Sequence, residues 1–164
     1  MKDKINLDQL REETRAYFES LRDKTQPYGA YRDGPDGEAG FYGICDVAIG
    51  RHLMGEDLIR LDPADRQSWS EHIHKYQDRD NGMFQCSDHI RGHALGTAVQ
   101  ALCSLEMPLA CWPVAYEMVR EPSAAIAFLE LADWHRIWGN SHNLFGVIVP
   151  YSHVANQTWR EAVW

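Results

Sequence analysis

The chain has 164 residues, of which 45% are hydrophobic and 24% are charged. This length and this balance are typical of one globular domain that buries its own core. The 16 Lys and Arg residues are outnumbered by 24 Asp and Glu residues, which gives a formal net charge of -8. Such a charge disfavours the backbone of a nucleic acid or an anionic membrane surface as a partner. A neutral or cationic ligand is easier to accommodate.

The sequence shows no hydrophobic targeting segment and no membrane-spanning stretch. Lys2 and Lys4 stand at the start of an amphipathic segment, and no run approaches the roughly 18 uncharged apolar residues that a membrane span needs. The cysteines form no Cys-x-x-Cys pair, which is typical of reduced core thiols. We therefore expect a cytoplasmic protein without a cofactor. The four cysteines are Cys45, Cys86, Cys103 and Cys111.

Apolar residues recur at helical spacing through most of the chain, and turn-forming residues separate the segments. Asn6 and Asp62-Pro63 are helix-start signals. The segment 31–40 holds four Gly or Pro residues and is predicted to be a loop. A run of small and aliphatic residues predicts that the fourth helix is buried on more than one side. We predict helices over 7–22, 43–54, 62–76, 89–105 and 123–135.

The C-terminal third is less regular. Residues 114–120 predict one or two helical turns, and Gly139-Asn140 predicts a break. The apolar segment 144–154 contains Pro150, which predicts a helix that is kinked or stopped there. Residues 147–149 also suit a strand, but the chain offers no comparable strand to pair with it. With a last helix over 156–164, the sequence predicts an all-α fold of roughly seven helices.

The chain aligns with itself at an offset of 42 residues. In both copies a turn-rich loop passes an aromatic residue and leads into a helix of small and aliphatic residues. A period near 42 accommodates one helical hairpin, and such hairpins bury their faces by stacking. The matching positions are Asp36, Gly40, Asp46, Gly50 and Leu53 with Asp78, Gly82, Asp88, Gly92 and Leu95.

The stretch Gln77-Asp78-Arg79-Asp80-Asn81-Gly82-Met83-Phe84 resembles the QW motif of squalene-hopene cyclases and of related terpenoid-cyclase and protein prenyltransferase-like proteins. Trp69 and the segment 93–96 also suit the hairpin of that superfamily. The resemblance covers about residues 31–105 and implies stacked helical hairpins of the α/α-toroid type. In that superfamily the Gln and the aromatic residue tie an outer helix to the start of the next inner helix.

This sequence departs from the family pattern in two ways. The aromatic residue that closes the motif is Phe84 instead of Trp, and roughly seven helices suffice for only about half a ring. We therefore expect a single toroid-like domain over 1–164 that is truncated or is completed by a partner chain. An incomplete ring exposes an apolar edge, and such an edge usually marks an interface, here that of a homo-oligomer.

Two motifs near the second loop have both a chemical and a structural interpretation. The segment 78–81 is similar to the acidic Asp-x-Asp-Asp motif of terpene cyclases, but its last acid is replaced by Asn81, and we interpret it as a turn. Cys86, Asp88, His89 and His93 fall within eight residues, and the two histidines have the i, i+4 spacing of a zinc pair. A polar pocket rim or ordinary surface histidines explain the same residues, and we predict no metal.

If the ring forms, the loops before the inner helices line one mouth of its cavity. Acidic and imidazole groups beside Trp and Tyr suit acid/base chemistry on a sugar or on a carbocation precursor, although the same residues also suit the polar plug of an empty toroid. The candidate catalytic residues are Asp88, His89, His142 and Asp46, and the candidate ligand-binding residues are His93, Trp138 and Tyr42.

The resulting hypothesis is a terpenoid-cyclase-like toroid domain that binds, and in one version processes, a small neutral ligand. Carbohydrate is favoured over isoprenoid because the candidate residues are polar and the acidic motif is degraded. Whether the protein is an enzyme stays open at this point. The alternative is a non-catalytic helical module that completes its ring by oligomerising or by docking on a partner.

Overall fold

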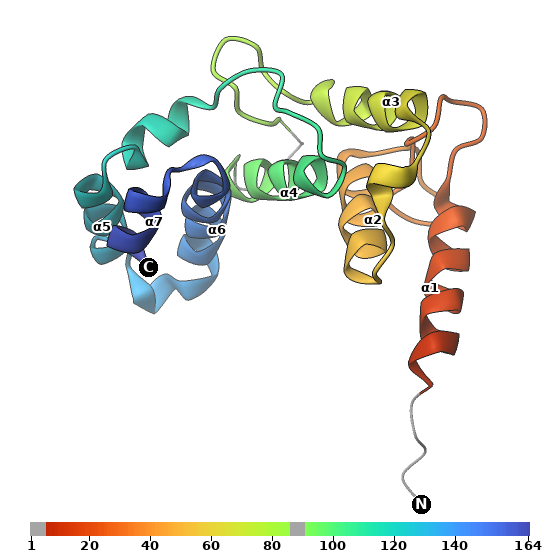
Figure 1. Ribbon diagram of the computed structural model, residues 1–164, viewed down its shortest axis with the longest axis horizontal. Helices are drawn as coiled ribbons and strands as arrows, with labels where there is room; N and C mark the ends of the chain where they lie inside the picture. Colours follow the sequence, from red (N-terminus) through yellow and green to blue (C-terminus); the bar gives the residue numbers. More distant parts are fainter. Residues whose placement is uncertain (1–5, 86–90) are drawn as a thin grey trace, which may run out of the picture.

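Helix α4 lies at the centre of the molecule, with α2 packed against one side and α6 against the other (Figure 1). The computed structural model describes residues 6–85 and 91–164. Helix α3 contacts both α2 and α4, and α5 contacts α7. The α-helices of the described chain are α1 (Leu7–Leu21), α2 (Phe41–Leu53), α3 (Pro63–His74), α4 (Arg91–Ser104), α5 (Pro122–Glu130), α6 (Ile137–Val154) and α7 (Gln157–Val163). Short 3₁₀ helices are η1 (Leu58–Arg60), η2 (Val114–Val119) and η3 (Trp134–Arg136).

The all-α prediction is confirmed. Residues 147–149 belong to α6, so the strand alternative for them is wrong. Among the described residues, strand-like pairing is limited to three isolated bridges. These bridges join Arg22 to Tyr31, Arg32 to Ala39, and Gln77 to Phe84.

Three helices begin where their capping residues predict. The side chain of Asn6 accepts hydrogen bonds from the first backbone N–H groups of α1, Asp62 does so for α3, and Asn156 for α7. These caps satisfy N–H groups that have no partner within the helix. The residue before α2, Gly40, has no side chain to cap the helix, and the Asp33 carboxylate in the preceding loop accepts from the Gly43 N–H at 2.5 Å instead.

Two boundaries in the C-terminal third differ from the prediction. The predicted helix over 123–135 ends at Glu130, and Trp134 lies in the separate turn η3. The predicted break at Gly139-Asn140 is wrong, because α6 runs through it from Ile137. The Asn140 side chain donates to the carbonyl of Asp133 at 2.6 Å, so it ties the first turn of α6 to the residue before η3. Pro150 does not stop α6, which continues to Val154.

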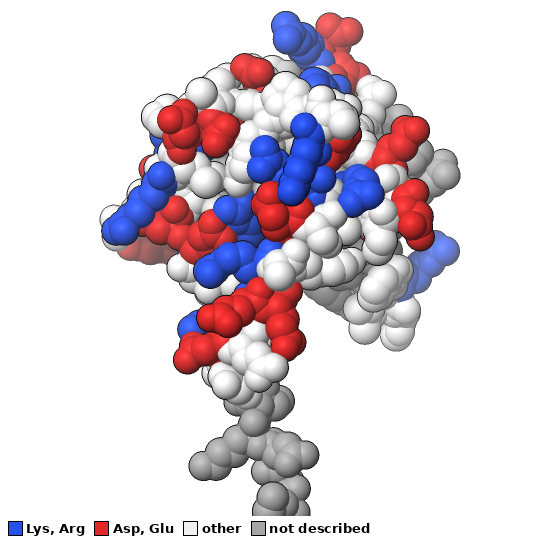
Figure 2. Space-filling view, turned by 90° about the vertical axis from the view of Figure 1, so that its right-hand side faces the viewer, with Lys and Arg blue, Asp and Glu red and all other residues white. Residues whose placement is uncertain are grey.

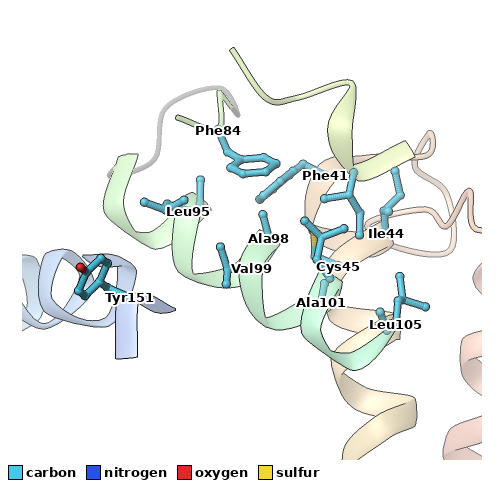
Figure 3. Packing of buried hydrophobic residues seen from close by; sticks show 14 of the residues in the cluster. Phe41, Ile44, Cys45, Phe84, Leu95, Ala98, Val99, Ala101, Leu105 and Tyr151 are labelled. Carbon is cyan, nitrogen blue, oxygen red and sulfur yellow. The ribbon is translucent and has the colours of Figure 1, made fainter. Parts of the chain in front are cut away.

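The core forms where α4 meets α2, as Figure 3 shows. Phe41, Ile44 and Cys45 of α2 are buried against apolar residues of α4, and Phe84 closes the core from the loop before α4. As predicted, α4 is apolar on more than one side. Leu105, directly after α4, is buried as well. The buried apolar residues of α4 include Ala94, Leu95, Ala98, Val99, Ala101 and Leu102.

The two loops of the predicted repeat have the same hairpin form, but their register is not 42. Each is closed by a bridge between residues seven apart, Arg32 with Ala39 and Gln77 with Phe84. The offset between these bridges is 77 − 32 = 45 residues. At this offset Asp33 corresponds to Asp78, and both carboxylates accept backbone hydrogen bonds, Asp33 from Gly43 of α2 and Asp78 from Asp80 of its own loop. The offset of 45 between the two loops therefore describes the repeat better than the offset of 42 that matched the glycines in the sequence.

The QW-like segment is a structural turn in which Gln77, Gly82 and Phe84 are buried and Arg79 and Asp80 are exposed. The Gln77 amide nitrogen donates to the carbonyls of Gly82 at 2.9 Å and Cys111 at 2.8 Å, and its oxygen accepts from the N–H of Ala110 at 3.1 Å. The Asp78 carboxylate accepts from Asp80 and other groups of the turn. These bonds lower the pKa of Asp78, the backbone N–H of Asp80 contributing most. Segment 78–81 therefore stabilises a turn, in agreement with its structural interpretation.

Replacing Gln77 tests how much this turn stabilises the fold. We expect Gln77→Leu to lower the free energy of unfolding by about 2 kcal/mol or more, because it leaves several buried backbone groups without partners. Gln85→Ala is the matched control, since exposed Gln85 donates a single bond to Asp78. Urea unfolding measures both changes, and equal losses would contradict a special role for Gln77.

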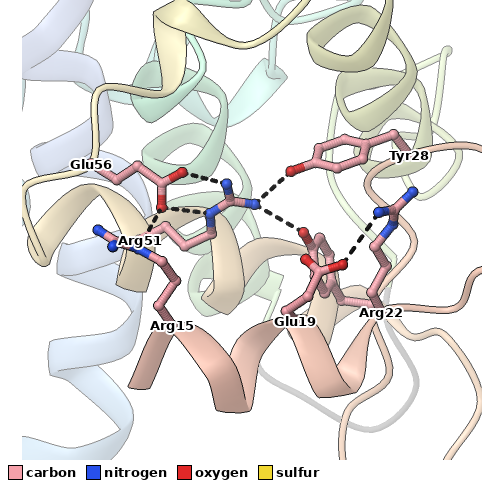
Figure 4. Close-up of polar contacts among 7 residues, drawn as sticks. Arg15, Glu19, Arg22, Tyr28, Arg51 and Glu56 are labelled. Carbon is pink, nitrogen blue, oxygen red and sulfur yellow. Dashed lines mark hydrogen bonds and ion pairs between the residues drawn. The ribbon is translucent and has the colours of Figure 1, made fainter. Parts of the chain in front are cut away.

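A polar cluster ties α1, α2 and the loop between them together (Figure 4). The Arg51 guanidinium donates to the hydroxyls of Tyr28 at 2.6 Å and Tyr31 at 3.0 Å, and it forms a bidentate ion pair with Glu56. Arg15 of α1 lies 3.8 Å from the same Glu56 carboxylate. The hydrogen bonds from Arg51 are the main reason that the pKa of Glu56 is lowered. Since its polar groups are mutually satisfied, we interpret this cluster as structural.

The lowered pKa of Glu56 makes stability depend on pH. The folded state favours the ionised carboxylate, so its stabilisation is complete above the ordinary value of 4.5 and is lost as the pH falls below it. We expect Glu56→Gln to destabilise the protein at pH 7 and the difference from wild type to shrink at about pH 3. Urea unfolding at both values measures this change. Exposed Glu12, replaced by Gln, is the control, and a difference that stays constant with pH would contradict the prediction.

The molecular surface carries charges of both signs. On the face that Figure 2 shows, Lys and Arg side chains are interspersed with Asp and Glu side chains, and acidic groups gather on the first turns of α1. Asp8, Glu12 and Glu13 are exposed on these turns. Within the described ranges, no helix has the length and apolar character that crossing a membrane requires.

Candidate functional site

Four of the predicted site residues form a continuous series of side-chain rings. The ring centroids of Tyr42 and His93 lie 5.7 Å apart, those of His93 and His142 lie 4.8 Å apart, and those of His142 and Trp138 lie 4.9 Å apart. Tyr42 is the second residue of α2, His93 the third of α4 and Trp138 the second of α6. The series therefore joins the N-terminal ends of three helices that are far apart in the sequence. We call these four residues the ring series.

The orientation of His142 determines which of its nitrogens faces a ligand. Its Nδ1 lies at hydrogen-bonding distance from the backbone carbonyl oxygen of Trp138. Because a carbonyl only accepts, Nδ1 carries the proton, and Nε2 of the neutral ring is the acceptor. His142 and His93 are partly buried, whereas Trp138 is 79% exposed. The series thus ends in an indole that solvent reaches.

Close contact between two helices brings the two imidazoles together. Gly146 of α6 lies directly against the backbone of Gly92 in α4, and a Cβ added to Gly146 would overlap that backbone. Gly96 is similarly covered by the ring of Phe145. His93 follows Gly92, and His142 lies one helical turn before Gly146. The small residues therefore set the distance between His93 and His142.

Asp46 lies on α2, one turn after Tyr42. Although it reaches solvent, the protein packed around it raises its pKa, and the negative charge of Asp33 raises it further. Asp33 was not predicted as a site residue. Its contact with α2 spans ten residues and leaves no local signal in the sequence.

Asp88 and His89, two of the candidate catalytic residues, lie outside the described residues, as does Cys86 of the alternative zinc cluster. His93 is therefore the one member of that cluster that the structure places. Among the residues that the structure does describe, no group of three or more His, Cys, Asp or Glu side chains is arranged to hold a metal ion.

A wide hollow lies elsewhere, between the end of α1 and the loop before α2, and shares no residue with the ring series. It has a volume of about 680 Å³. Arg32 borders it, but its guanidinium already donates to the carbonyls of Ser20, Leu21 and Pro35. Its charged lining is of mixed sign, so the hollow has no evident ligand preference. The lining residues are Arg22, Asp23, Lys24, Gln26, Arg32, Gly37, Glu38 and Ala39.

Comparison with known proteins assigns no family to this chain. No protein-family model, no curated protein and no solved structure matches it significantly. The chemical interpretation of the ring series therefore depends on its own geometry.

Adding one methyl group at the helix contact tests the arrangement of the site. Alanine favours a helix over glycine, yet we expect Gly146→Ala to destabilise the protein by about 1–3 kcal/mol, because the two helices must move apart. His142 ring resonances in NMR spectra should shift as its distance from His93 grows. Gly34→Ala is the control, since nothing lies within 4 Å of an added Cβ there. An unchanged melting temperature in Gly146→Ala would contradict the close contact.

Proposed function

We propose that the N-terminal ends of α2, α4 and α6 bind a small neutral ligand, and that this ligand is a carbohydrate. The observation that carries the proposal is the ring series, which combines an exposed indole with imidazole and phenol groups. The Trp138 face offers apolar area for the C–H face of a sugar ring. His142 Nε2 offers an acceptor for a hydroxyl group. An isoprenoid chain has no hydroxyl groups along its length to donate to His142 Nε2.

Acid/base processing of the ligand is the further part of this proposal. Asp46, with its raised pKa, is the candidate proton donor, and His142 Nε2 is the candidate proton acceptor. The predicted roles of Asp88 and His89 stay predictions. So does the cytoplasmic location.

The proposed architecture for this site is an incomplete α/α toroid of the terpenoid-cyclase type. The central row α2, α4 and α6 alternates along the chain with α3 and α5, as inner and outer helices of a toroid do. The bonded side chain of Gln77 also supports a toroid, because it ties two segments together as the Gln of the QW motif does. Here the second segment is the one after α4 instead of the start of an inner helix. The resemblance concerns architecture, and the chemistry rests on the site.

A ligand titration of site variants tests the proposal. We expect a panel of mono- and oligosaccharides to include at least one that shifts the NMR resonances of the ring series, and an isoprenoid alcohol to shift none. His142→Ala and Trp138→Ala should each weaken this binding about tenfold, the loss of roughly one good contact, with little change in melting temperature. Asp46→Asn should retain binding and lose turnover.

His153→Ala is the matched control, because His153 lies exposed near the other end of α6. It should bind the ligand as wild type does. If His142→Ala and Trp138→Ala bind sugar normally, or if they lose as much stability as affinity, the ring series is a structural cluster and the proposal is wrong.

One observation favours the second candidate, a helical module that assembles with a partner. The segment between α5 and the second residue of α6 exposes large apolar side chains to solvent. Exposed apolar groups gathered in this way are typical of interaction surfaces.

A further inference from the structure

Four large apolar side chains protrude from the start of α6 and the turn before it. Leu131 is 85% exposed, Trp134 52%, Ile137 64% and Trp138 79%. Trp134 lies in the turn η3, and Ile137 and Trp138 are the first two residues of α6, so the exposed apolar side chains are close together along the chain. We call these four residues the apolar ridge. Leaving so much apolar area in water is costly, and contact with a partner removes that cost.

A shallow apolar groove borders the ridge. It has a volume of about 170 Å³ and is lined by residues of α5 and α6 and of the turn after α5. Leu131 belongs to both the ridge and the groove. A surface that presents a ridge beside a groove matches itself when a second copy is turned by a two-fold rotation. The groove residues are Phe128, Leu131, Ala132, Asn140 and Leu144.

The charges beside the ridge also match a second copy. Glu130 precedes it, and Arg136 lies within it, both exposed. In the part of the chain that the structure describes, neither side chain takes part in an ion pair. A two-fold axis placed between Glu130 and Arg136 would bring Glu130 of each copy toward Arg136 of the other, so both charges would gain a partner. A uniformly charged partner would satisfy only one of them.

We propose that the apolar ridge is the interface of a symmetric homodimer, in which Glu130 of each copy pairs with Arg136 of the other. This deepens the second candidate function and does not require a ligand. The net charge of -8 on each copy opposes association, but charges more than about 8 Å apart are largely screened at physiological ionic strength. The short ridge indicates a small interface and therefore a micromolar dissociation constant.

Charge exchange tests the pairing directly. In sedimentation velocity over a micromolar concentration series, wild type should pass from monomer to dimer. Glu130→Arg alone and Arg136→Glu alone should each weaken association about tenfold, because like charges then meet across the axis. An equimolar mixture of the two variants should restore association, since both pairs are again of opposite sign. A mixture no stronger than either variant alone would overturn the two-fold pairing.

The apolar contact is tested separately. Leu131→Asp should abolish the dimer, whereas Leu53→Asp, at a 73% exposed position on α2, should not. Both positions are exposed, and far-UV circular dichroism verifies that both variants fold. A wild type that stays monomeric throughout the series overturns the proposal, as does a Leu131→Asp variant that dimerises normally.

The sugar panel, applied to the same proteins, separates this inference from the carbohydrate proposal. The variants leave Tyr42, His93, His142 and Trp138 in place. Dimerisation without sugar binding would reject only the carbohydrate site. A monomeric wild type that binds sugar through Trp134 would show that the ridge is a carbohydrate platform and would overturn the dimer.

Discussion

The direct contact between the backbones of α4 and α6 is the constraint on which the site depends. With side chains on both helices at the crossing, the axes would separate, and the His93 and His142 rings would no longer meet. The glycines that permit this contact have little helix propensity of their own. Their helices form because α4 is also held by α2 through a buried apolar interface. Packing of the core thus stabilises a crossing that local preferences oppose.

The remaining polar contacts hold the outer elements at fixed distances from this core. Gln77 joins the end of α3 to the segment after α4, and Arg51 joins α2 to the loop after α1. Trp69 of α3 donates to the carbonyl of Ile44 in α2 at 3.0 Å, so even the largest buried side chain has a polar partner. Each of these bonds satisfies a group that would be costly to bury alone. Together they orient helices whose apolar contacts alone would permit sliding.

Local sequence signals predicted the helices well where caps mark their ends, as Asn6 and Asp62 do. They failed at Gly139-Asn140, where α6 continues through both residues and the Asn140 side chain donates to the carbonyl of Asp133, the residue that precedes η3. The assembly of Tyr42, His93, His142 and Trp138 combines residues from three helices. Helical spacing places each of them on its own helix, but their distances depend on the α4–α6 crossing, which no local pattern encodes. Asp33 was missed because its bond to Gly43 of α2 spans ten residues of the chain.

Trp138 links the two proposals, because it belongs both to the ring series and to the apolar ridge. A dimer that covers the outer face of its indole would leave only the edge near His142 for a sugar, and ligand and dimer would then compete. A dimer that holds the indole against the His142 ring would instead preorganise the site and favour binding. Thermodynamic linkage makes either effect reciprocal, so a ligand that weakens the dimer must itself bind the monomer more tightly. The sign of this coupling therefore reports which face of Trp138 the partner contacts.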